Sequence, residues 1–187
     1  MRKALLIVAV AILVSSAAQA QTNGYIGLFT DDTRSSWCGT GTTPYPVEMY
    51  IWCLPNVDGM RCAEFMIAYP ADATVIPATV TQNPDLALVM GNLADGVSAC
   101  YAVCVTEWNW VFHQTIYVTG PNQNMIQIVE NPQSNAILFN DCVEPDRPVY
   151  DAIPWTNLYL NYVDGIDPEC SQTSTRESTW GAIKSLY

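Results

Sequence analysis

Two tryptophans and a neighbouring acid form the segment of the sequence best suited to binding a ligand. Trp108 and Trp110 flank Asn109, which places both indoles on one face of an extended strand, and Glu107 precedes them. Two coplanar indoles could stack on sugar rings. Alternatively they fill the core, since bulky aromatic side chains bury the most area there. We favour the core and retain a carbohydrate-binding site as the alternative.

Few residues in the sequence support a catalytic function. His113 is the only histidine, so a Cys–His or Ser–His pair must use it. Cys104 lies nine residues upstream, and no G-x-S-x-G motif is present. A pair of acids could cleave a glycosidic bond, but acids are so abundant here that pairs arise by chance. We therefore assign no catalytic residue and rank a small extracellular hydrolase third.

Calcium is the one candidate cofactor. Asn161, Asp164 and Asp167 place oxygen ligands three residues apart around Gly165. Calcium takes six to eight oxygens, and the full EF-hand loop pattern is missing. The alternatives are a structural calcium site and a solvated acidic turn.

The cysteines predict disulfides. The seven are Cys38, Cys53, Cys62, Cys100, Cys104, Cys142 and Cys170. In an exported chain this number predicts three bridges and one remaining cysteine, which is either a free thiol or pairs between chains; we expect the free thiol. Cys100 and Cys104 would sit about 13 Å apart on an extended strand, beyond bridging range, so each should pair with another cysteine.

Residues 1–20 have the features of a signal peptide. Arg2 and Lys3 precede an apolar stretch over residues 4–14, and Ala18-Gln19-Ala20 fits the small-x-small cleavage rule. Cleavage would leave 167 of the 187 residues, beginning at Gln21 and with no membrane span. We expect a bacterial protein that is secreted or held at the cell surface.

The net charge restricts the partners. The chain has a formal net charge of −11, and loss of Arg2 and Lys3 with the signal peptide makes the net charge −13. Such a chain repels phosphate backbones and anionic membrane surfaces. We therefore expect a protein or glycan partner and no nucleic acid.

The stretch from Pro46 to Tyr69 should form the centre of the fold. Its first half is apolar on both faces, which is typical of a buried strand, and Ala63–Tyr69 alternates with period two. Asn56-Val57-Asp58-Gly59 between them has turn residues, so we predict a hairpin. In one register Cys53 would lie opposite Cys62, which would permit a bridge.

This stretch resembles cohesin-like and other immunoglobulin-like modules of secreted bacterial proteins. The resemblance rests on the two-sided apolar strand, Asp58-Gly59, and A-E-F-x-I-x-Y-P over residues 63–70. It implies a sandwich of two antiparallel sheets.

Further strands are expected about every ten residues. They cover 24–30, 73–80, 85–90, 97–105, 108–118, 125–129, 136–139 and 158–162. This spacing predicts an all-β antiparallel immunoglobulin-like or cohesin-like sandwich over 21–142. An acidic extension over 143–170 could add a strand, with Cys142 and Cys170 bridging each other or tying it to the core.

Residues 171–187 should form a polar linker and a short helix. Ser174 and Glu177 have capping-box spacing, and Trp180, Ile183 and Tyr187 share one helix face. The end resembles T-W-G-x-[IV]-K-[AS]-L-[YF] tails of other secreted bacterial proteins, which implies sorting or docking. Alternatively the helix packs on its own domain. The leading function is a non-enzymatic β-sandwich with a surface structural or protein-interaction role.

Overall fold

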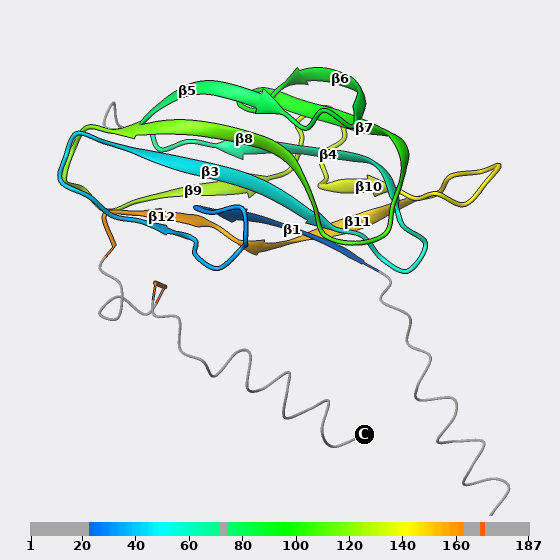
Figure 1. Cartoon of the computed structure of the whole chain (residues 1–187). Helices are drawn as coiled ribbons and strands as arrows, with labels where there is room; N and C mark the ends of the chain where they lie inside the picture. Colours follow the sequence, from blue (N-terminus) through cyan, green and yellow to red (C-terminus); the bar gives the residue numbers. More distant parts are fainter. Residues whose placement is uncertain (1–22, 72–74, 163–168, 171–187) are drawn as a thin grey trace, which may run out of the picture.

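Twelve strands make up the fold in the computed structural model, which describes residues 23–71, 75–162 and 169–170 (Figure 1). They are β1 (Gly24–Phe29), β2 (Cys38–Gly39), β3 (Tyr45–Leu54), β4 (Met60–Ala68), β5 (Val75–Gln82), β6 (Leu86–Asn92), β7 (Gly96–Val105), β8 (Asn109–Val118), β9 (Asn124–Val129), β10 (Leu138–Asn140), β11 (Val149–Thr156) and β12 (Leu158–Leu160). Within these ranges no helix could cross a membrane. The predicted signal peptide and C-terminal helix, with Trp180, Ile183 and Tyr187, lie outside the described residues.

The strands form two facing layers. The first, which we call the β3 sheet, has the order β11-β1-β3-β8-β5. The second, the β4 sheet, has β7 and then β6 on one side of β4. On the other side of β4 lie β10 and β9, and β9 continues to β12 and β2. Because β10 also pairs with β11, the two sheets are joined along that side.

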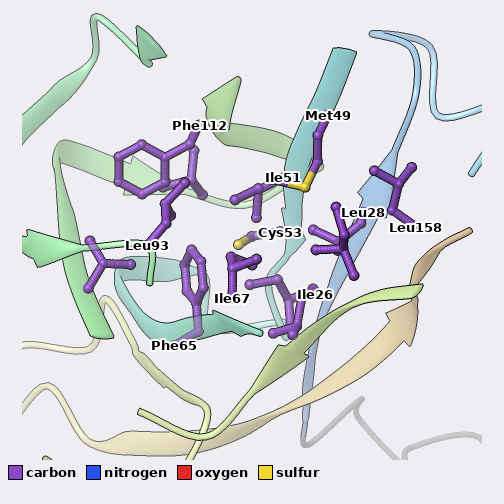
Figure 2. Packing of buried hydrophobic residues seen from close by; sticks show 14 of the residues in the cluster. Ile26, Leu28, Met49, Ile51, Cys53, Phe65, Ile67, Leu93, Phe112 and Leu158 are labelled. Atoms are coloured by element: carbon purple, nitrogen blue, oxygen red, sulfur yellow. The ribbon is translucent and has the colours of Figure 1, made fainter. Parts of the chain in front are cut away.

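Alternation along the strands builds the core between the sheets. Met49, Ile51 and Cys53 of β3 are fully buried, and Phe65 and Ile67 of β4 face them (Figure 2). These residues follow the predicted period of two. In β1, Ile26 and Leu28 enter the core, whereas Tyr25 is only half-buried because adjacent residues of a strand face opposite ways.

The predicted hairpin between β3 and β4 is wrong. Strand β3 pairs with β1 and β8, while β4 pairs with β7, β9 and β10, so the two strands belong to opposite sheets. Residues 55–59 carry the chain from one sheet to the other. The turn chemistry was recognised correctly, since the Gly59 N–H donates to the Asn56 carbonyl at 3.2 Å and Gly59 has φ of +80°. Local turn residues do not decide which sheet the next strand joins.

Three disulfides and one free thiol confirm the predicted count. The bridges are Cys38–Cys170, Cys62–Cys100 and Cys104–Cys142. Cys53 does not pair with Cys62, because the Cys53 thiol is buried in the core between the sheets, whereas Cys62 points to the opposite face of the β4 sheet and is bridged to Cys100. Cys142 and Cys170 likewise do not pair with each other. Each ties the later part of the chain to the sandwich.

Residues 149–160 contribute to the core. Strand β11 pairs in parallel with β1, and β12 pairs with β9 and β2. Ala152, Leu158 and Leu160 are buried in the central cluster. The acidic segment therefore supplies two strands here and is not only a peripheral extension.

Candidate functional site

The predicted pair of tryptophans lies at the start of β8. Strand β8 begins at Asn109, so Trp108 precedes the strand and Trp110 lies within it, opposite Trp52 of β3. Both Trp108 and Trp110 are half-buried, and Glu107 is exposed. The predicted sugar platform of Trp108 and Trp110 stays a prediction.

Trp108 packs against a tryptophan that the sequence analysis did not select. The rings of Trp108 and Trp155 have centroids 5.3 Å apart and are tilted by 48°. Phe29 meets Trp108 edge-on at 6.2 Å, and Tyr25 meets Trp155 edge-on at 5.5 Å. Trp155 is nevertheless 47% exposed. Its place on β11, beside β1, could not be read from sequence because β11 lies in the segment interpreted as an extension.

These rings form a layer on the outer face of the β3 sheet. We call Tyr25, Phe29, Trp52, Trp108 and Trp155 the aromatic cluster. Phe29 and Trp52 are buried, yet neither belongs to the central core. A Cβ on Gly27 would lie 2.9 Å from the Phe29 ring, so this glycine leaves the space that the ring occupies. The cluster is therefore a second apolar layer outside the sandwich core.

Arg34 lies over this layer. Its guanidinium carbon is 4.4 Å from the centre of the Trp52 ring and 5.5 Å from that of Trp108, which are cation–π distances. Within the described part of the chain, no carboxylate lies within ion-pair distance of Arg34. The indole N–H of Trp52 is buried and has no hydrogen-bond acceptor.

His113 belongs to a polar group on the same face. Its Nε2 lies 2.5 Å from the Glu48 carboxylate, which also accepts from the Thr115 hydroxyl at 3.1 Å. The imidazole stacks on Tyr50 at 4.3 Å. A Cys–His pair has no nucleophile here, because six of the cysteines are bridged and Cys53 faces the core on the other side of β3. Burial raises the pKa of the Cys53 thiol, which keeps it protonated.

Asn161 has a structural role in the described chain. Its amide donates to the carbonyls of Gly120 and Asn122 at 2.9 and 2.6 Å, and its oxygen accepts from Tyr45. Asp164 and Asp167 lie outside the described residues, so the calcium site stays a prediction. Across the described ranges, no three His, Cys, Asp or Glu side chains are grouped to hold a metal.

The outer face of the β4 sheet has a different character. Two rows of residues cross it: Leu88, Cys100, Cys62 and Asn140, then Met90, Ser98, Glu64 and Leu138. The row between them faces the core and includes Ala99, Ala63 and Phe139, all fully buried. Leu88 and Met90 on β6 are 49% and 55% exposed. The Cys62–Cys100 bridge lies beside them and links β4 to β7.

Comparison with known proteins identifies the class of fold. The seventh type I cohesin of ScaB from Pseudobacteroides cellulosolvens aligns over 81% of this chain and 99% of its own, with a TM-score of 0.52 and 10% identity. The sixth cohesin of scaffoldin B from Acetivibrio cellulolyticus, in complex with a dockerin, aligns over 76% of this chain and 100% of its own, with a TM-score of 0.52 and 10% identity. A type I cohesin from Clostridium thermocellum, also in complex with a dockerin, aligns over 76% of this chain and 96% of its own, with a TM-score of 0.51 and 9% identity.

The chain therefore has a cohesin-like β-sandwich fold, which confirms the resemblance seen over residues 46–70. At these identities the likeness is one of fold. The sequence itself matches no family profile and no curated protein.

Proposed function

We propose that the chain is an exported, non-catalytic module that binds a protein partner of the dockerin class through the outer face of its β4 sheet. The observation that carries the proposal is the cohesin-like fold, because two of the cohesins that it resembles were solved in complex with dockerins. Three disulfides support export to an oxidising compartment.

The composition of the β4 face supports docking of a protein. Leu88 and Met90 expose adjacent apolar side chains on β6, and the neighbouring Ser98 is small. Exposed apolar side chains beside polar ones are typical of protein interfaces, where a few side chains carry most of the binding energy. Among the described strands, β6 pairs only with β7, which leaves its other side open to a partner (Figure 1).

Binding to a panel of dockerins tests this proposal. We expect the oxidised protein to bind at least one dockerin saturably. Leu88→Asp and Met90→Asp should each weaken that binding by about tenfold or more, because each substitution places a charge in the apolar contact. Ile76→Asp is the matched control, since Ile76 is also 49% exposed but lies on β5 of the other sheet. The proposal fails if no dockerin binds, or if Ile76→Asp weakens binding as much as Leu88→Asp.

A further inference from the structure

We propose that the aromatic cluster and Arg34 form a second binding site, for a neutral oligosaccharide of β-linked pyranoses. This site lies on the outer face of the β3 sheet. It is therefore separate from the β4 face to which we assign the protein partner, and the two proposals can fail independently.

The exposed rings supply the stacking surface. Trp155 is 47% exposed, and Trp108 beside it is half-buried. Phe29 supports Trp108 from one side and Tyr25 supports Trp155, both through edge-on contacts, so the two indoles are held in place without a ligand. Rigid, prearranged rings lose little freedom on binding. A β-linked pyranose with equatorial hydroxyls presents flat C–H faces that match such rings.

The angle between the indoles favours a single oligosaccharide chain as the ligand, and not the flat face of a crystalline polysaccharide. The rings of Trp108 and Trp155 are tilted by 48° at a centroid separation of 5.3 Å. Two sugar rings stacked on them must therefore turn relative to each other. A soluble oligosaccharide can twist about its linkages in this way, whereas a crystalline polysaccharide face cannot.

Arg34 supplies the polar contacts. Its guanidinium carbon lies 4.4 Å from the centre of the Trp52 ring and 5.5 Å from that of Trp108, which places it beside the exposed rings. A guanidinium carries five N–H donors. A hydroxyl-rich ligand can provide acceptors to them. Apolar rings with a few polar groups converging on them are characteristic of small-ligand sites.

The surrounding charge favours a neutral sugar. The carboxylates of Asp32, Glu48 and Asp31 give this face a negative potential; after burial, which is the larger cause, they raise the pKa of the Tyr50 hydroxyl. The whole chain carries −11. An oligosaccharide with carboxylates would be repelled by this field, although Arg34 is positive.

Calorimetric titration of the oxidised full chain tests the assignment. The probes are cellohexaose and xylohexaose as neutral β-1,4-linked chains, and hexagalacturonate as the charged comparison. We expect saturable binding of at least one neutral chain and weaker or no binding of hexagalacturonate. Trp155→Ala and Arg34→Gln should each weaken binding by about tenfold. Tyr117→Ala should not, because Tyr117 is similarly exposed, at 46%, but lies towards the other end of β8.

Melting curves of each variant establish that the fold is retained before affinities are compared. Three results would overturn the proposal: no saturable binding of either neutral chain, equal loss in Tyr117→Ala and Trp155→Ala, or preference for hexagalacturonate. A change of oligomeric state in Trp155→Ala without any sugar binding would instead assign the cluster to contacts between copies of the chain. Leu88→Asp should leave sugar binding unchanged, so the sugar-binding result is independent of the result of the dockerin test.

Discussion

Asp31 fixes the loop that carries Arg34. Its carboxylate accepts hydrogen bonds from the backbone N–H groups of Thr33, Ser35 and Ser36 at 2.7–3.0 Å. Partial burial opposes ionisation of Asp31, but these hydrogen bonds and those from the Thr33 and Ser35 hydroxyls outweigh it and lower its pKa to about 2. Arg34 itself has φ of +62°, a conformation that needs such support.

The lowered pKa predicts a pH-dependent effect of Asp31→Asn. A carboxyl with a depressed folded-state pKa stabilises the protein above its unfolded value near 4, and that contribution is lost as the pH falls towards 2. The Tm of the wild type should therefore exceed that of Asp31→Asn at pH 5–7. This difference in Tm should shrink between about pH 4 and 2. Asp32→Asn, which removes the same charge from the exposed neighbour, is the control. A gap that does not change with pH would contradict the account.

At the scale of elements, periodicity predicted most strands but not their partners. The alternation in β3, β4, β7 and β8 was readable because each strand places one face in the core. The two-residue β2 has no period to detect and is held by β12 and the Cys38–Cys170 bridge. The crossing between sheets at 55–59 was misread as a hairpin, because its turn residues suit both connections.

A threonine at the end of β11 adds two hydrogen bonds to the ladder between β11 and β1. The register of β11 shifts between Ile26 and Gly27, which disturbs the regular ladder. The Thr156 hydroxyl accepts from the Leu28 N–H at 3.1 Å and donates to the Leu28 carbonyl at 2.9 Å. Both groups of Leu28 are thereby satisfied in a buried position.

Thr156→Val should consequently destabilise the sandwich. It keeps the shape of the side chain but leaves the Leu28 N–H and carbonyl without this partner, which costs about 1–3 kcal/mol. For a protein of this size we expect Tm to fall by roughly 2–12 °C. Thr156→Ser retains the hydroxyl and should restore most of the difference. Equal melting temperatures for the Val and Ser variants would show that these hydrogen bonds contribute little.

At the scale of the whole molecule, one disulfide connects the early strand β2 to the last described residue. Cys38–Cys170 joins residues 132 positions apart, and the Trp37 indole N–H donates to the Glu169 carbonyl at 2.7 Å. The folded unit is therefore fixed as far as Cys170. Residues 171–187 follow this point without another cysteine.

We predict that this tail is separable from the sandwich. Deleting residues 171–187 removes neither a bridge nor a core residue of the described chain, so Tm should change by less than about 2 °C, while the cellular location of the protein changes. If Trp180 instead packs on the domain, its burial contributes a few kcal/mol and deletion should lower Tm by several degrees. Melting curves of the full and shortened chains decide between these outcomes.

The candidate sites were only partly predictable. Trp108 was identified from its neighbours in sequence, but Trp155 and Arg34 join it only through the pairing of β11 with β1 and the loop after β1. The strand over 85–90 was predicted, but the exposure of Leu88 and Met90 was not, since it depends on how the sheets cover one another. Surfaces made from separate strands require the topology, which local patterns do not contain.

Hydrogen exchange with and without a bound dockerin tests the central proposal most directly. If the β4 face is the docking surface, amides of β6 and of the adjoining part of β7, over residues 86–100, should exchange more slowly in the complex. Amides of β1 and β11 under the aromatic cluster should be unchanged. Protection confined to β1 and β11, or no protection on β6, would contradict the assignment of the protein partner to the β4 sheet.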